Sequence, residues 1–194
     1  MMRRIIIAVS MALVIVGVAL SAARYFSGLK NGGDATDRTP IAGSADLVNK
    51  KGLNELVLTR LSDSAVVKLD TLKGKVHLVT FWASWCEACM AEMPSIQALY
   101  ARYHTQGFDV VAINVDDEPE KVAPRIIKKF NLEFNIYTDR DESVSEFFNV
   151  VAIPFNVVLD KNLKVAWSES GERDWMSNES QAEIQKLLSG AINN

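Results

Sequence analysis

Hydrophobic residues form one long run near the start of the chain and then short, regularly spaced groups from residue 53 onward. The first run, residues 5–23, contains no charged residue and follows Arg3 and Arg4. A segment of that length crosses a hydrocarbon core about 30 Å thick and exceeds the apolar region of a typical signal peptide, about 7–15 residues. We therefore expect residues 1–30 to be a signal anchor with a transmembrane helix over residues 5–23.

The basic pair before this run predicts its orientation. Positive flanking residues stay on the cytoplasmic side, so the rest of the chain is expected to be exported. This places a single-pass protein in the inner (cytoplasmic) membrane, with its folded domain on the periplasmic, extracytoplasmic side. Two alternatives remain open: cleavage at the small residues Ser21, Ala22 and Ala23, or a buried core helix.

Residues 31–52 separate the anchor from the groups that follow. Gly, Asp, Thr and Ser dominate this stretch, and apolar periodicity is missing. We expect a flexible linker that spans roughly 25 Å root-mean-square. The domain expected over residues 53–194 would then lie close to the membrane surface.

The remaining pattern alternates between strand and helix periods. Residues 56–61 and 66–69 predict a hairpin, residues 76–82 a buried strand, and residues 86–104 a helix with apolar residues every three or four positions. Further strands are expected over residues 108–115, 134–137, 155–159 and 164–167, and further helices over residues 120–130, 142–148 and 178–188. Such alternation implies parallel pairing, to which hairpins add antiparallel edges. The expected fold class is α/β, a central mixed β-sheet with helices on both faces and an N-terminal β-hairpin extension.

Composition and charge agree with one exported domain. Apolar residues make up 48% of the chain, enough for a domain of about 140 residues to bury a core. After residue 30 the chain carries 17 basic and 24 acidic residues, a net charge of −7. So acidic a domain argues against nucleic acid as a partner.

The only two cysteines of the chain, Cys86 and Cys89, lie three positions apart where the buried strand gives way to a helix. The free N–H groups and the dipole of a helix N-terminus favour an anion, so a thiol there ionises more easily. The thiolate is the form that attacks disulfides, and a second cysteine one turn later can resolve the mixed disulfide. We expect Cys86 to attack and Cys89 to resolve.

Two other interpretations of the cysteine pair are weaker. A zinc site would need further ligands, but there is no second cysteine pair, and His77 and His104 do not have ligand spacing. A purely structural disulfide closing so short a loop would add little stability. We therefore expect neither a metal nor a cofactor.

The residues around the cysteines resemble a known family. Residues 81–94, Phe-Trp-Ala-Ser-Trp-Cys-Glu-Ala-Cys-Met-Ala-Glu-Met-Pro, are similar to the active-site segment of the thioredoxin superfamily, and in particular of its TlpA/ResA-like membrane-anchored thiol–disulfide oxidoreductases. Ile153-Pro154 and residues 171–175, which follow later in the chain, also resemble that family. The likeness covers about residues 55–190 and implies a thioredoxin fold.

The resemblance assigns further roles around the cysteines. It implies a cis Ile153–Pro154 bond facing them, where backbone pairs with a substrate strand. Trp85 is itself expected to shield the thiols and to offer a docking surface, with a core role as the alternative. Three residues depart from the pattern. Thr80 replaces a buried aspartate of cytoplasmic thioredoxins, Ala88 replaces a frequent proline, and Phe155 replaces a threonine.

Two acids bear on the direction of electron flow. Glu87 lies inside the motif, and Glu92 matches the acidic residue that the family carries three positions after the second cysteine. At about 7 Å, each would oppose a thiolate by roughly 0.6 kcal/mol in water and about 2.4 kcal/mol at an effective dielectric of 20. A site that withholds stabilisation from its thiolate is expected to be a reductant. The alternative for Glu87 is a solvent-screened side chain; Glu92, if buried, is also expected to carry protons.

These observations lead to one functional hypothesis and two alternatives. The hypothesis is an enzyme that reduces disulfides in exported proteins and is itself reduced by a membrane thiol donor; the resemblance implies cytochrome c maturation as one destination. A disulfide-forming oxidase and a non-catalytic docking module with a permanent disulfide remain as alternatives.

Overall fold

The fold is known from a computed structural model that describes residues 52–190. The predicted anchor over residues 5–23, and all but the last residue of the predicted linker over residues 31–52, lie outside the described residues and stay predictions. Within residues 52–190, no helix is both long and apolar enough to span a membrane.

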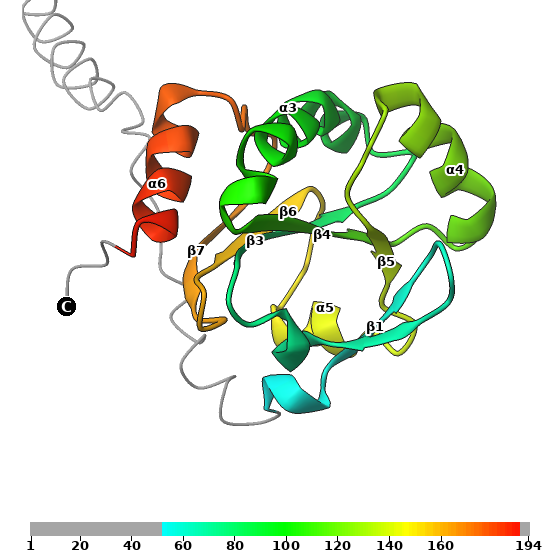
Figure 1. Ribbon diagram of the computed structural model, residues 1–194. Helices are drawn as coiled ribbons and strands as arrows, with labels where there is room; N and C mark the ends of the chain where they lie inside the picture. The colour runs from blue at the N-terminus through cyan, green and yellow to red at the C-terminus, as the bar shows by residue number, and fades with distance from the viewer. Residues whose placement is uncertain (1–51, 191–194) are drawn as a thin grey trace, which may run out of the picture. The chain divides into compact units, whose positions relative to one another are not determined.

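Seven strands form one mixed sheet in the order β2-β1-β5-β4-β3-β6-β7 (Figure 1). The strands are β1 (Val57–Arg60), β2 (Val66–Lys68), β3 (Val76–Trp82), β4 (Phe108–Asn114), β5 (Ile136–Thr138), β6 (Phe155–Leu159) and β7 (Val165–Ser170). The β3–β4 and β4–β5 pairs are parallel, and the other four are antiparallel. The predicted mixed sheet and N-terminal hairpin are confirmed, and β1 joins the hairpin to the main sheet through β5.

Helices cover both faces of the sheet, as predicted (Figure 1). They are α3 (Glu87–Tyr103), α4 (Pro119–Phe130), α5 (Ser143–Phe147) and α6 (Asn178–Leu188), with short 3-10 helices η1 (Leu53–Glu55), η2 (Leu69–Leu72) and η3 (His104–Gln106). One core lies between the sheet and helices α3, α4 and α6, and it contains Trp82, Ile96, Ala123 and Ile184. The second core lies on the α5 face and contains Phe81, Val144 and Phe148.

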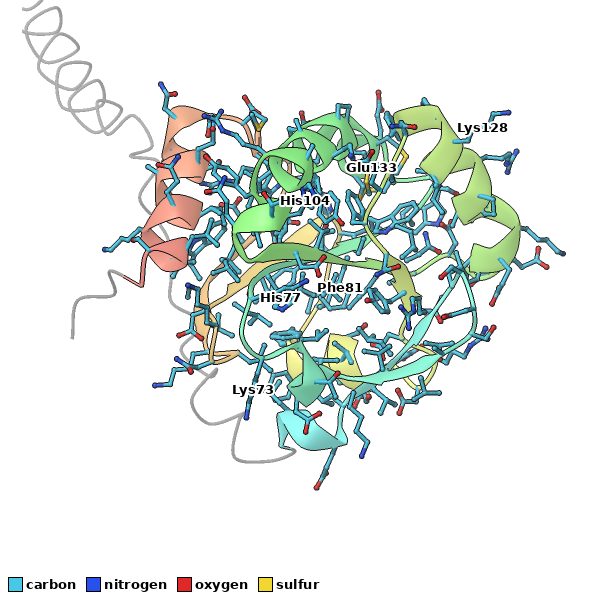
Figure 2. All side chains as sticks on the ribbon, viewed as in Figure 1. Lys73, His77, Phe81, His104, Lys128 and Glu133 are labelled. Atoms are coloured by element: carbon cyan, nitrogen blue, oxygen red, sulfur yellow. A yellow bond between two sulfur atoms is a disulfide. The ribbon has the colours of Figure 1, made fainter. Side chains whose placement is uncertain are left out.

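Strand β3, in the centre of the sheet, confirms the buried strand that the apolar run at residues 76–82 predicts. All seven of its residues are buried, since β4 and β6 flank it and both its faces are covered. A strand buried on both faces reads as a near-continuous apolar run, and residues 76–82 form one that only His77 and Thr80 interrupt. Side chains alternate between the cores, so that Phe81 points into the α5-side core (Figure 2). This strand delivers the chain to the cysteines.

Several element boundaries differ from the predictions. Strand β5 begins at Ile136 instead of residue 134, because its pairing with β4 starts at Ala112↔Ile136. Strand β7 extends to Ser170, where it pairs with Phe155 of β6. The pairing partner sets each of these ends, and the hydrophobic pattern of one strand does not contain that information.

Candidate active site

Cys86 and Cys89 lie at the start of α3 and form a disulfide with an S–S distance of 2.07 Å. Cys86 is the N-cap residue in extended conformation, and its sulfur accepts a hydrogen bond from the Cys89 N–H at 3.1 Å. Cys86 is 8% exposed and Cys89 is 1% exposed. Cys86 is therefore the more accessible of the two cysteines, and its sulfur accepts from a first-turn N–H of α3, which fits the expected roles of attacking and resolving cysteine.

The turn that carries the chain into α3 is fixed by one carboxylate. Asp116, just after β4, accepts hydrogen bonds from the N–H of Ser84 at 2.8 Å and from its hydroxyl at 2.9 Å. Asn114 also donates to Asp116, at 2.7 Å. Because parallel β3 and β4 end at the same edge of the sheet, the loop after β4 holds the loop that carries Cys86.

The predicted cis bond between Ile153 and Pro154 is confirmed. Pro154 is buried, and its carbonyl accepts from the N–H of Gly171 at 3.0 Å, which fixes it beside the end of β7. Ile153 packs against both cores. It also lines a groove of about 780 Å³ together with Trp85, which is 71% exposed. Two of the residues expected to meet the substrate, Trp85 and Ile153, therefore border one groove, and the binding role of all three stays a prediction.

The two acids near the cysteines occupy opposite environments. Glu87 is exposed, which agrees with the solvent-screened alternative. Glu92 is 1% exposed, and its burial raises the pKa of the carboxyl to about 7. Near neutral pH, Glu92 therefore exists in both protonation states, which a group that carries protons requires.

Three N–H donors converge on the Glu92 carboxylate from distant parts of the chain. The Asn156 amide of β6 donates to Oε1 at 3.1 Å and to Oε2 at 3.4 Å. The Arg173 backbone N–H donates to Oε1 at 2.8 Å, and the Trp175 indole N–H donates to Oε1 at 3.3 Å. These bonds lower the pKa against the larger effect of burial.

The side chain of Arg173 holds this donor segment in place. Its guanidinium forms ion pairs with Glu169 of β7 at 2.9 Å and Glu183 of α6 at 3.0 Å. It also lies 4.6 Å from the ring centre of Trp167 and 5.3 Å from that of Trp175, which stack on each other. Sequence reasoning identified residues 171–175 only as a family segment and missed Asn156. The available signal for Asn156 was its place as the one polar residue in the apolar strand β6.

The histidines do not join the cysteines. His77 is buried on β3, where its Nε2–H donates to the Leu72 carbonyl at 2.7 Å, whereas His104 lies at the end of α3 (Figure 2). Burial lowers the pKa of His77. Among residues 52–190, no cluster of three or more His, Cys, Asp or Glu side chains is placed to hold a metal ion.

The fold and the paired cysteines define the class: a thioredoxin-like protein of the TlpA/ResA type. The Redoxin family model matches residues 43–185, so the chain belongs to the Redoxin family.

Among similar proteins, the thiol-disulfide oxidoreductase ResA of Oceanobacillus iheyensis is 34% identical over 100 residues, 52% of this chain and 52% of the relative. ResA of Geobacillus kaustophilus is 36% identical over 98 residues, 50% of this chain and 56% of the relative. The matched region spans about half the length of these curated relatives.

Solved structures show the same fold. A secreted Mycobacterium tuberculosis disulfide oxidoreductase, described as homologous to E. coli DsbE, has a TM-score of 0.57 at 25% identity, covering 71% of this chain and 96% of that one. StoA from Bacillus subtilis has a TM-score of 0.55 at 21% identity, covering 67% of this chain and 95% of that one, and this likeness concerns the fold alone.

Proposed function

We propose that this protein is a thiol–disulfide oxidoreductase that reduces disulfides in exported proteins. The observation that carries the proposal is the arrangement around α3. An outer sulfur lies at the helix N-terminus, an inner sulfur is buried behind it, and a buried carboxyl with a pKa of about 7 follows one turn later. The relatives named thiol-disulfide oxidoreductase ResA support the same class of activity.

The reaction proceeds in two exchange steps from the reduced enzyme. The Cys86 thiolate attacks one sulfur of a substrate disulfide, forming a mixed disulfide and releasing the first substrate thiolate. Cys89 then loses its proton and attacks the Cys86 sulfur, which closes the Cys86–Cys89 disulfide and releases the second substrate thiolate. Two electrons pass from the enzyme to the substrate, and the two substrate thiolates take up protons from their surroundings.

Glu92 is the group proposed to manage the inner proton. It follows Cys89 by three positions on α3, so both lie on the same face of the helix. Its carboxylate form accepts the proton that Cys89 must lose, and its protonated form returns one. A pKa near 7 suits both tasks at neutral pH.

The reducing direction is inferred from charge. An ionised Glu92 in a buried setting opposes a nearby thiolate with little solvent screening, which destabilises the reduced, ionised site. Because the carboxyl is partly protonated near neutral pH, this opposition grows as the pH rises through about 7. Glu87 adds little, since its side chain is exposed.

One observation favours a disulfide-forming oxidase instead. The Cys89 N–H donates to the Cys86 sulfur, and this contact together with the helix N-terminus stabilises a thiolate at Cys86. A strongly stabilised thiolate makes the reduced form more stable and the protein more oxidising. The equilibrium reduction potential of the Cys86–Cys89 pair decides between these effects.

Location and partners complete the proposal. The expected anchor at residues 5–23 would hold the domain on the extracytoplasmic face of the inner membrane, where a membrane thiol donor re-reduces it and exported disulfide proteins are its substrates. Apocytochrome c is one such substrate implied by the TlpA/ResA resemblance, because its cysteines must be reduced before haem attaches.

Two measurements test the location. Alkaline phosphatase fused after residue 52 should be active, and carbonate washing should leave the protein in the membrane. An inactive fusion contradicts export, and a protein released by carbonate contradicts the anchor.

Insulin-disulfide reduction tests the enzyme itself. The parent protein, supplied with a thiol donor, should reduce insulin, and Cys86→Ser should abolish the activity. Equal activity in both would show that the site only docks partners. A measured potential near −120 mV, about that of a strong oxidant, would overturn the reducing direction, whereas one near or below about −230 mV supports it.

A further inference from the structure

The two oxygens of Glu92 are bound unequally. Oε1 accepts from the Arg173 backbone, the Trp175 indole and the Asn156 amide, whereas Oε2 accepts only the longer contact from Asn156 at 3.4 Å. A proton that arrives at the carboxyl therefore disturbs fewest bonds on Oε2. The resulting O–H is a buried donor, and such a donor needs an acceptor nearby.

Asn156 holds an acceptor that is not in use. Its side chain is 0% exposed, and its Oδ1 is buried without a hydrogen-bond partner among the described residues. The amide nitrogen of the same side chain already contacts Oε2 of Glu92. A half-turn of the amide exchanges its nitrogen and oxygen, which brings Oδ1 to Oε2. Because Oδ1 makes no bond in its present position, this rotation breaks only the two contacts that the amide nitrogen makes with Glu92, at 3.1 Å to Oε1 and 3.4 Å to Oε2.

The other partners of Glu92 cannot make this exchange. A backbone N–H and an indole N–H donate only, so the donors of Arg173 and Trp175 remain on Oε1 in both states. Ion pairs with Glu169 and Glu183 fix the segment that carries them. Asn156 is therefore the adaptable partner in an otherwise fixed set.

We propose that Asn156 is a positioning residue for proton exchange at Glu92, its amide donating to the ionised carboxylate and, after rotating, accepting from the protonated carboxyl. The proposal rests on the proposed function, in which Glu92 takes the proton of Cys89 during the second exchange step. That proton moves from the sulfur to Oε2 while the electron pair stays on sulfur, and Asn156 keeps the carboxyl in the same place before and after.

The charges around Glu92 are consistent with two accessible states. Glu169 on β7 raises its pKa, and the guanidinium that offsets Glu169 belongs to Arg173, which also binds Glu183 of α6. Cys89 is the titratable neighbour on α3 once the disulfide is reduced. Strand β6 carries no charged residue. The ionisable residues of β3 and β4, His77 and Asp109, alternate with the residues of those strands that face α3.

Substitution of Asn156 separates this role from packing. Asn156→Leu keeps the approximate size and removes both the donor and the acceptor, whereas Asn156→Thr restores a hydroxyl that does either task. Val157→Ala is the matched control, because Val157 lies next in β6 but points into the α5-side core. Should Asn156→Leu fail to fold, Asn156→Ala and Asn156→Ser give the same contrast between a methyl and a hydroxyl.

The first measurement reads the carboxyl directly. Infrared difference spectra of the oxidised protein between about pH 5 and about pH 9 isolate Glu92, with Glu92→Gln identifying its band. The protonated carboxyl should show a hydrogen-bonded O–H in the parent and in Asn156→Thr, and a free one in Asn156→Leu. An identical band in the parent and in Asn156→Leu would overturn the proposal. This readout needs no substrate, so it stands even if the reducing direction is wrong.

The second measurement follows the resolving step. From a preformed mixed disulfide at Cys86, closure of the Cys86–Cys89 bond should be roughly tenfold slower in Asn156→Leu and lose the limb of its pH profile near pH 7, with recovery in Asn156→Thr. Val157→Ala should keep the parent profile. If Asn156→Leu slows closure no more than Val157→Ala and keeps the limb, Asn156 only packs.

Discussion

The outer and inner halves of the active site use the same residue types in opposite ways. The outer half contains Cys86 and Glu87 at the start of α3, and the inner half contains Cys89 and Glu92 one turn further along. Glu87 is exposed, so solvent screens its charge; Glu92 is buried, and its pKa rises to about 7. The difference teaches that burial decides the state of an acid near a thiol: in solvent it is a screened charge, and inside the protein its pKa moves to about 7.

The largest expected effect comes from removing the two sulfurs one at a time. Cys89→Ser leaves the outer Cys86 able to attack but removes the thiol that resolves, so mixed disulfides with natural partners should accumulate in cells. Cys86→Ser should trap few, because the remaining thiol is only 1% exposed. Non-reducing gels of membrane fractions measure the trapped species. Equal trapping by both variants would show that exposure does not divide the work.

The next largest effect concerns stability against pH. Glu92 has a pKa of about 7 in the folded protein, against an ordinary value of 4.5 for a glutamate in water, so the folded protein binds the extra proton between these limits. Its contribution to stability is therefore fully present below about pH 4.5 and is lost as the pH rises through about 7, by roughly 3 kcal/mol at most. Glu92→Gln should remove this decline.

Denaturant unfolding of the parent, Glu92→Gln and Glu87→Gln across this pH range measures that effect. The difference in free energy of unfolding between Glu92→Gln and the parent should grow in favour of the variant as the pH rises. Glu87→Gln should follow the parent throughout. A parent curve parallel to that of Glu92→Gln would mean that ionising the buried carboxyl carries no desolvation cost.

The sequence was sufficient for the outer half of this site and insufficient for the inner half. The motif at residues 86–89 is local, and a strand-to-helix junction implies a thiol at a helix N-terminus. The partners of Glu92 are not local: Asn156, Arg173 and Trp175 follow it by 64, 81 and 83 positions. They meet because β6 pairs with β3 and the segment after β7 returns across α3. The pairing register Thr80↔Asn156 is needed to place the Asn156 side chain where it can contact Glu92.

This register also gives meaning to one departure from the family pattern. Thr80 stands where cytoplasmic thioredoxins carry a buried aspartate, and it lies directly opposite Asn156 in the sheet. A buried acid comes close to this position from α3 instead, because Glu92 accepts a hydrogen bond from Asn156. Residue 80 alone does not reveal this arrangement, since Asn156 links the two positions: it pairs with Thr80 in the sheet and donates to Glu92 of α3.

A smaller effect tests the fixed donors of the inner half. Trp175→Phe keeps an aromatic ring but removes the indole N–H that binds Glu92, so the ionised carboxyl loses a bond and its titration midpoint should move upward by roughly half to one pH unit. Trp167→Phe is the control, because its ring stacks on Trp175 while its own indole N–H has no partner among the described residues. An equal upward movement in both variants would attribute the effect to packing and not to the hydrogen bond.

The smallest expected effect belongs to the outer acid. Glu87→Gln removes a negative charge beside the Cys86 thiolate, which stabilises the reduced form and should make the pair more oxidising. At about 7 Å in water-like surroundings the repulsion is roughly 0.6 kcal/mol, or about 13 mV on the two-electron scale. Because the side chain is exposed, salt should reduce this change further.

Glu92→Gln is the matched comparison. If repulsion dominates there, its potential should rise by tens of millivolts above pH 7 and resist salt; if proton transfer dominates, the potential should barely move while exchange slows. A salt-resistant change in Glu87→Gln as large as that of Glu92→Gln would show that burial does not separate the two acids.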